Sequence, residues 1–291
     1  MKNKLAIIGG SGLYDITEFK IQEEISINTP WGNTSDVIKK FLYKDNEFYF
    51  LPRHGRGHIH SPSKINYKAN IYALKKLGIS DIVSISAVGS LKKGLPPKTF
   101  IIVDQFIDKT TQRSNTFFDG NIVAHISMAQ PTSNGLMNSC EHALKKNNIS
   151  YQRGGTYVVI EGPHFSTLAE SRLYKSWNAD VIGMTNMPEA KLSREAEIRY
   201  ASLAMVTDYD CWHPDHENVT VNQVINTFSE NISKAKIVVK DIIGNYENYI
   251  ENNDPTCTCL DNAIITDFKL LKDNDIKKLD TILERVLKNK N

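Results

Sequence analysis

Short apolar runs rich in β-branched residues alternate with stretches of helical period along most of this chain, and most of the runs end next to glycine, serine or threonine. This alternation is typical of α/β proteins with a largely parallel sheet. The 291 residues suffice for one large α/β domain or two small ones, and they contain no internal repeat or linker. The predicted strands are 5–8, 48–51, 81–86, 101–103, 157–161, 180–184 and 202–206. The predicted helices are about 66–77, 135–147, 167–177 and 189–199.

The C-terminal part predicts two more helices and a loop. One helix should begin near Thr220, where Gln223 completes a capping box. Its apolar stripe is Val221, Val224, Ile225, Phe228 and Ile232. Apolar residues at helical spacing from Ile276 to Leu287 predict a terminal amphipathic helix that packs on the body. The Asn-rich residues 244–256 are expected to form an exposed loop.

Composition excludes several classes of protein. Hydrophobic residues make up 41% and charged residues 23%, which is ordinary for a globular chain and excludes a disordered one. A formal net charge of +2 gives no reason to expect nucleic acid or a membrane as a partner. No stretch approaches the roughly 18 to 20 apolar residues of a membrane helix, and no signal-peptide pattern is present, so we expect a cytoplasmic protein. Four cysteines do not form a disulfide framework of the secreted kind.

The first motif that can carry chemistry is the glycine turn after the first strand, Ile7-Ile-Gly-Gly-Ser-Gly-Leu-Tyr-Asp15. Glycine lets backbone amides approach an anion, and the Ser11 hydroxyl adds a donor. By itself the motif is compatible with contact to phosphate or substrate and with a purely structural turn. A nicotinamide site is the least favoured alternative. A dinucleotide fingerprint needs a small residue at position 15, where Asp15 would repel a pyrophosphate.

The second motif, Pro52-Arg-His-Gly-Arg-Gly-His-Ile-His60, follows the strand at 48–51. Arg53 and Arg56 suit a dianion such as phosphate through charge-assisted hydrogen bonds. A solvated loop and a metal site are the alternatives. Metal is the least favoured, because the two glycines oppose the helix that would place His54 and His58 on one face, and no carboxylate completes a shell.

Polar clusters follow other predicted strands, at the edge where open α/β sheets place their ligands. Residues 85–90, Ile-Ser-Ala-Val-Gly-Ser, are by themselves more typical of a strand end and a turn. In Thr207-Asp-Tyr-Asp-Cys-Trp212, the carboxyls of Asp208 and Asp210 are hard to ionise together in a dry cleft, so one is a candidate proton carrier. A solvated capping turn is the alternative. The remaining clusters are Glu161-Gly-Pro-His-Phe-Ser166 and Gly183-Met-Thr-Asn-Met-Pro-Glu189.

In order along the chain, these motifs and Asp104-Gln-Phe-Ile-Asp108 resemble those of the trimeric nucleoside phosphorylases, and within them the methylthioadenosine phosphorylases, over about residues 4–240. The resemblance implies one α/β domain over residues 1–291, less family-like from about 245, with a twisted mixed sheet partly closed into a barrel and flanked by helices. It implies a homotrimer, sometimes doubled to a hexamer. The implied reaction is phosphorolysis of 5′-methylthioadenosine by inorganic phosphate, giving adenine and 5-methylthioribose 1-phosphate. A broader phosphorylase acting on adenosine or methylthioinosine is the alternative.

The resemblance also assigns roles to residues. Those for phosphate are Ser11, Arg53, His54, Ser86, the Ala87 amide and Thr185. Those for the nucleoside are Phe165, Met184, Asp208, Tyr209 and Asp210, with Ser166 and Val221 bearing on specificity. His125 matches a histidine that reaches into a neighbouring subunit's site. Asp208, protonated at purine N7, and Asp210 would be catalytic, and neither a metal nor an organic cofactor is implied.

Two positions depart from the pattern. Gly183 replaces an asparagine of some relatives, which bears on the shape of the purine pocket. Cys257 and Cys259 resemble a short disulfide of archaeal relatives, but we expect them to be reduced or redox-variable, because so small a ring strains the bond and the cytosol is reducing.

Two other functions stay open at this point. A hydrolase of the same fold would use water and would need no phosphate site. A nucleoside-binding sensor would keep the pocket without the reaction.

Overall fold

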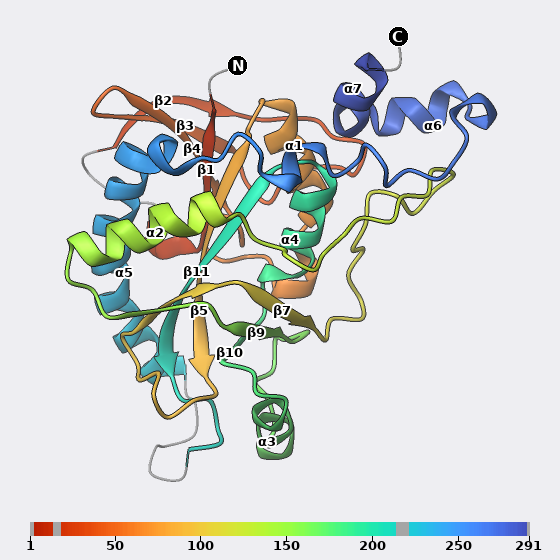
Figure 1. Cartoon of the computed structure of the whole chain (residues 1–291). Coiled ribbons are helices and arrows are strands. Elements are labelled where there is room, and N and C mark those ends of the chain that lie inside the picture. Colours follow the sequence, from red (N-terminus) through yellow and green to blue (C-terminus); the bar gives the residue numbers. More distant parts are fainter. Residues whose placement is uncertain (1–2, 14–18, 214–220, 290–291) are drawn as a thin grey trace.

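Eleven strands form one mixed sheet with helices on both faces (Figure 1). The computed structural model describes residues 3–13, 19–213 and 221–289, without the side chains of Ser11, residues 221–226 and Phe228. The strands are β1 (Leu5–Gly9), β2 (Lys20–Ile25), β3 (Ile38–Tyr43), β4 (Asn46–Pro52), β5 (Asp81–Ser90), β6 (Phe100–Val103), β7 (Gln105–Asp108), β8 (Tyr151–Arg153), β9 (Thr156–Val159), β10 (Val181–Gly183) and β11 (Arg199–Asp208).

β5 is the centre of the sheet. It pairs in parallel with β1 on one side and β11 on the other, and its last residues pair antiparallel with β10. One branch continues from β10 to β9 and β7, and the other continues from β11 to β6 and β8. Only Asp104 separates β6 from β7, so the chain joins the two branches, although β6 and β7 are not paired with each other. The predicted fold class is confirmed.

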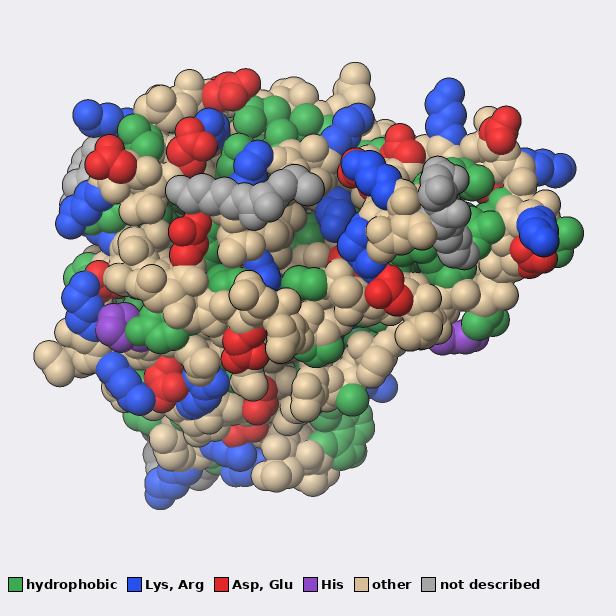
Figure 2. Space-filling view, turned by 45° about the horizontal axis from the view of Figure 1, so that its top comes forward, with side chains coloured by type: hydrophobic (Ala, Val, Ile, Leu, Met, Phe, Trp, Pro, Cys, Tyr) green, Lys and Arg blue, Asp and Glu red, His purple; other side chains and the backbone are tan. Residues whose placement is uncertain are grey.

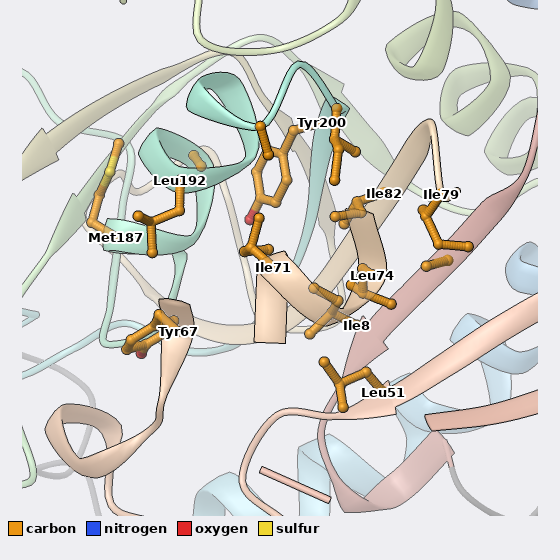
Figure 3. Packing of buried hydrophobic residues seen from close by; sticks show 14 of the residues in the cluster. Ile8, Leu51, Tyr67, Ile71, Leu74, Ile79, Ile82, Met187, Leu192 and Tyr200 are labelled. Carbon is orange, nitrogen blue, oxygen red and sulfur yellow. The ribbon is translucent and has the colours of Figure 1, made fainter. Parts of the chain in front are cut away.

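In the described part of the chain, two large apolar cores lie on the two faces of the sheet, and a smaller cluster around Leu91, Val158 and Tyr174 lies beside β10. The helices are α1 (Tyr67–Lys76), α2 (Asn134–Lys146), α3 (Leu168–Ser176), α4 (Asn186–Glu195), α5 (Val221–Asn245), α6 (Asp273–Lys278) and α7 (Asp280–Lys288). One core joins the sheet to α1, α4 and α7, and Figure 3 shows Ile71 and Leu74 of this core beside Ile82 of β5, with Leu192 farther away beyond Ile71. The other joins the sheet to α2 and α5. Burial of each such Leu or Ile side chain stabilises the fold by about 1.5–3 kcal/mol.

The predicted strands are all present, but four strands were not predicted. β2, β3, β7 and β8 carry polar or partly exposed residues, so they lack the apolar runs that marked the others. The helix expected at 189–199 begins earlier, at Asn186, and ends at Glu195, because the chain turns there into β11.

The segment 244–256, expected to be an exposed loop, is exposed at most of its positions but is anchored at three of them. Tyr246, Asp254 and Thr256 in this segment are buried. The Tyr246 hydroxyl donates to the carbonyl of Asn3 at 2.9 Å, so the segment packs on the start of the chain. The expected terminal helix packs on the body as predicted, but it is divided at Leu279 into α6 and α7.

Charge is dispersed on the molecular face drawn in Figure 2, where acidic and basic side chains are interspersed. Within residues 3–13, 19–213 and 221–289, no helix is long and apolar enough to cross a membrane. All four cysteines are free thiols. The Sγ atom of Cys259 donates to the carbonyl of Arg194 at 3.0 Å, and that of Cys257 lies 3.7 Å from Arg199 Nη1.

Candidate active site

A cavity of about 390 Å³ lies where β1, β4, β5, β10 and β11 end. β1, β4, β5 and β11 are parallel, so their carboxyl ends lie at one edge of the sheet, and β10 joins them by pairing antiparallel with the last residues of β5. The cavity brings together most residues of the expected site. It is lined by Arg53, His54, Ser86, Ala87, Phe165, Ser166, Met184, Thr185, Asp208 and Asp210.

Arg53 forms the floor of one end of the cavity and is 1% exposed. Its Nε and Nη2 atoms donate to the two carboxylate oxygens of Glu189 at 2.8 and 3.1 Å. Nη1 donates to the Ile85 carbonyl at 3.1 Å, and Nη2 also donates to the Ser84 hydroxyl at 2.6 Å. Burial alone would lower the pKa of Arg53, but Glu189 raises it above its ordinary value. The guanidinium is therefore charged, and its charge is balanced.

Three hydroxyl groups lie beside this guanidinium. Ser86, Tyr157 and Thr185 have buried oxygen atoms that make no hydrogen bond within the described part of the chain. Burial raises the pKa of Tyr157, and the nearby Ser86 and Thr185 hydroxyls lower it by less. Ser86 and Thr185 line the cavity, and because buried hydroxyls without a partner are costly, these two indicate a polar ligand.

Gly183 has a steric reason to be glycine. A Cβ atom there would lie 2.1 Å from the Tyr157 hydroxyl oxygen. An asparagine at this position therefore requires a different placement of Tyr157. In this chain the Tyr157 hydroxyl occupies the space that an asparagine side chain would need at position 183.

His54 is held by its own loop. Its Nδ1 atom lies 2.9 Å from the carbonyl oxygen of His60, and the His60 amide donates to the His54 carbonyl at 3.0 Å. The His54 ring stacks on His58, with centroids 4.0 Å apart and an interplanar angle of 11°. Burial, and then the charges of Arg53 and the neighbouring histidines, lower the pKa of His54 to about 3.

At the other side of the cavity, Asp208 and Asp210 form a carboxyl pair. Asp208 Oδ1 accepts the Asp210 amide at 2.7 Å, and Oδ2 accepts the Thr207 hydroxyl at 2.7 Å. Burial raises the pKa of Asp208. Burial, and then the charge of Asp208, raise the pKa of Asp210 to about 6. Asp210 Oδ2 is buried without a hydrogen-bond partner among the described residues, and the nearby Ser171 hydroxyl lowers the pKa of Asp210 by less than burial raises it.

Sequence reasoning missed Arg113, which organises two loops of the site. Its Nη1 atom donates to the carbonyls of Met184 and Met187 at 2.7 and 2.6 Å. Its Nη2 atom donates to the carbonyls of Ile160 and Glu161 at 3.3 and 2.9 Å. One guanidinium thus joins the loop that carries Met184 to the loop that leads to the base side of the cavity. No local pattern around Arg113 signals this role.

Four expected site residues lie elsewhere or outside the description. Tyr209 does not line the cavity, and its hydroxyl donates to the Lys93 carbonyl at 3.2 Å. His125 is exposed and also does not line the cavity. The side chains of Ser11 and Val221 lie outside the described part of the chain. Among the described residues, no group of three His, Cys, Asp or Glu side chains is arranged to hold a metal ion.

This fold and this site define a glycosyl-transferring enzyme of the nucleoside phosphorylase type. Residues 4–244 match the sequence profile of the Phosphorylase superfamily. The S-methyl-5'-thioadenosine phosphorylase of Rhodospirillum rubrum is 49% identical to this chain over 97% of either protein. That of Bradyrhizobium diazoefficiens is 48% identical over 98% of either protein. The chain belongs to the Phosphorylase superfamily.

Solved structures agree. A methylthioadenosine phosphorylase from an antarctic soil metagenomic library superimposes with a TM-score of 0.89 at 42% identity, over 97% of this chain and 99% of that one. Methylthioadenosine phosphorylase from Schistosoma mansoni in complex with adenine gives a TM-score of 0.82 at 33% identity, over 89% of this chain and 96% of that one.

Proposed function

We propose that this chain cleaves 5′-methylthioadenosine with inorganic phosphate to adenine and 5-methylthioribose 1-phosphate. The observation that carries the proposal is the single cavity with buried anion-binding groups at one end and the Asp208–Asp210 pair at the other. The full-length similarity to methylthioadenosine phosphorylases supports the same substrate.

In this reaction the bond between C1′ and the adenine N9 breaks, and its electron pair goes to the base. A phosphate oxygen forms the new bond to C1′. A proton from the Asp208–Asp210 pair neutralises the charge that develops on the adenine at N7. Arg53, His54, Ser86, the Ala87 amide and Thr185 are the residues to which we assign phosphate. No metal or organic cofactor takes part in these steps.

We assign the nucleoside to the remainder of the cavity. Phe165, Ser166 and Met184 line it toward the carboxyl pair, and Leu13 and Ile232 add an apolar wall. An apolar wall suits a methylthio group, whereas a buried 5′-hydroxyl without a partner would cost about 1–3 kcal/mol. Val221 opens the helix that carries Ile232, and we keep it as the residue that selects the 5′ group. Broader use of adenosine or methylthioinosine is the second candidate function.

Product analysis tests the proposal. Methylthioadenosine, adenosine and methylthioinosine are incubated with the protein, with and without phosphate, and the products are separated by chromatography. We expect adenine from methylthioadenosine only when phosphate is present. Release in phosphate-free buffer would indicate a hydrolase, and calorimetric binding without release would indicate a sensor. EDTA should leave the rate unchanged, and a loss that zinc restores would contradict the metal-free mechanism.

We also propose a homotrimer, with a hexamer as a dimer of trimers. His125 lies in a segment, residues 123–125, that pairs with residues 263–265, and it does not line this chain's own cavity. Val123 and Ile265 in these paired segments are 40% and 65% exposed, and apolar side chains such as these are commonly covered in an assembly. Light scattering on the purified protein measures the mass. If it is a trimer, mixing an inactive cavity variant with a His125→Ala variant should restore part of the activity.

We place the protein in the cytosol. The observation that supports this is the four free thiols, two of which, Cys257 and Cys259, are close in sequence and only half-buried. Free cysteines of this kind persist in reducing compartments. Cell fractionation with an antibody to the chain checks the location.

A further inference from the structure

The orientation of the His54 ring is set by backbone groups. A carbonyl oxygen can only accept a hydrogen bond, so the 2.9 Å contact between His54 Nδ1 and the His60 carbonyl places the ring proton on Nδ1. The return bond from the His60 amide to the His54 carbonyl closes the loop. Gly55 and Gly57, with φ of +70° and +77°, allow the chain to turn this tightly. The tautomer of His54 is therefore fixed before any ligand enters.

The other ring nitrogen, Nε2, then bears a lone pair and no proton as long as the ring is neutral. Burial and the positive charges around His54 keep the ring neutral near neutral pH. The carboxylate of Glu189 is paired with Arg53 and accepts bonds from Ser84 and Tyr200, so burial is the chief cause of the lowered pKa of His54. His54 thus faces the cavity as a hydrogen-bond acceptor.

The rest of the cradle consists of donors. The hydroxyls of Ser86 and Thr185 are buried and unpaired among the described residues, and both line the cavity with His54. The charge of Arg53 is already balanced by Glu189. Selection among dianions at this site therefore depends on matching donors and acceptors more than on net charge.

From these contacts we propose that His54 accepts a hydrogen bond from the hydroxyl group of the bound hydrogenphosphate dianion, and so selects it over dianions of the same shape that carry no proton. The inference rests on the proposed phosphate site. It gives His54 a specificity role. The phosphate hydroxyl donates a hydrogen bond to His54 Nε2, and the unprotonated phosphate oxygens accept hydrogen bonds from Ser86 and Thr185. Sulfate has no proton to donate, so a lone pair would face a lone pair.

The wild-type protein provides the first test. Binding of phosphate, sulfate and monofluorophosphate is measured by calorimetry at about pH 8, where inorganic phosphate is chiefly the protonated dianion. Because a mismatched buried polar contact reduces affinity by roughly tenfold to a hundredfold, sulfate and monofluorophosphate should bind at least about tenfold more weakly than phosphate. Affinities within about threefold of each other would overturn the inference.

Two variants sharpen the test. In His54→Gln the side-chain amide can turn its NH₂ group toward the anion, so the preference for phosphate over sulfate should shrink to within about threefold. Ser86→Ala is the matched control: it removes a donor from the same cradle, so both anions should bind more weakly and their ratio should stay as in the wild type. An unchanged ratio in His54→Gln would overturn the inference. If that variant fails to fold, as judged by circular dichroism, the comparison of phosphate with monofluorophosphate on the wild type still decides.

The failure of this inference differs from the failure of the proposed function. If adenine is released only with phosphate, but sulfate binds as tightly as phosphate, the enzyme is a phosphorylase in which His54 does not read the proton. If adenine is released without phosphate, the proposed function fails, and with it the assignment on which this inference rests. Nitrogen-15 NMR of the histidines adds a direct measurement: an imidazolium at position 54 in the phosphate complex would overturn the acceptor role.

Discussion

The guanidinium of Arg53 and the carboxylate of Glu189 form a bidentate ion pair, and both residues are almost completely buried, with exposed fractions of 1% and 2%. Glu189 Oε1 also accepts the hydroxyls of Ser84 and Tyr200 at 2.6 and 2.9 Å. The pair connects the candidate anion site to the interior of the sheet. Its two charges depend on each other, since either one alone would be buried without compensation.

Replacing Glu189 with glutamine should therefore destabilise the fold. Removal of one partner of a buried ion pair typically costs about 3–5 kcal/mol. Urea unfolding of Glu189→Gln should show a loss of this size. Glu284→Gln is the control: its ion pair with Lys288 is exposed, so the change should be less than about 1 kcal/mol. Added phosphate should stabilise Glu189→Gln more than the wild type, because a dianion near Arg53 replaces the lost charge. Equal stabilisation of both would contradict phosphate binding next to Arg53.

Arg113→Lys tests the link between the two loops of the site. An ammonium group cannot donate to carbonyls of both loops with the fork geometry of arginine. We expect kcat/KM for the nucleoside to fall at least about tenfold, because misplacement of a site loop by even 1 Å is costly for catalysis. Steady-state kinetics measures this effect. Arg153→Lys, in a partly exposed pair with Glu141, should retain wild-type kinetics. Wild-type kinetics in Arg113→Lys would show that this side chain does not position the site.

Glu195 predicts a pH effect on stability. Its carboxyl accepts the Thr116 hydroxyl and the Phe117 amide, each at 2.6 Å, and burial raises its pKa to about 7. Since the folded-state pKa is raised, the contribution of this group is present at low pH and is lost as pH rises through about 7. Glu195→Gln does not titrate. Between pH 5 and pH 8 the wild type should therefore lose roughly 2 kcal/mol of unfolding free energy relative to the variant. Parallel pH profiles of the two proteins would contradict the raised pKa.

The meeting of Ser86 and Asp208 could be predicted, because both lie in the carboxyl-terminal halves of neighbouring parallel strands, β5 and β11. Thr185 joins them because β10 pairs antiparallel with the last residues of β5. Tyr209 was expected among them, but β11 ends at Asp208 and the chain turns at Asp210, whose φ is +52°. Asp208 and Asp210 face the cavity, and Tyr209 turns away toward Lys93.

Arg113 and the segment around Tyr246 could not be predicted in the same way. Arg113 bonds to carbonyls that are far apart in sequence, and every residue type has a carbonyl, so no side-chain pattern marks its partners. Tyr246 lies in an Asn-rich stretch whose composition is typical of a loop, but it is buried in the core between the sheet, α2 and α5, and its hydroxyl donates to the distant Asn3 carbonyl. Tertiary contacts decided both positions.

The last prediction concerns the choice of base by the carboxyl pair. Both oxygens of Asp208 accept bonds from this chain, while Asp210 has the pKa of about 6 and the unpaired oxygen. Adenine offers an acceptor at N7 and a donor at its amino group, which a carboxyl pair with one proton can match. The 6-oxo group of hypoxanthine only accepts, which suits an asparagine amide. Asp208→Asn should therefore lower kcat/KM for methylthioadenosine by roughly tenfold or more and favour methylthioinosine, since a mismatched buried polar contact costs about 1–3 kcal/mol. The fold should tolerate this change, because the Thr207 hydroxyl can turn to the Val88 carbonyl, already 3.2 Å away. Asp210→Asn should lose rate without gaining the 6-oxo substrate, because it removes a proton carrier and leaves the residue at position 208 in place. The efficiencies of wild type and both variants on the two nucleosides decide between these roles. An unchanged base preference in Asp208→Asn would show that Asp208 does not contact the purine edge, and a switch of preference in Asp210→Asn would transfer that role to Asp210.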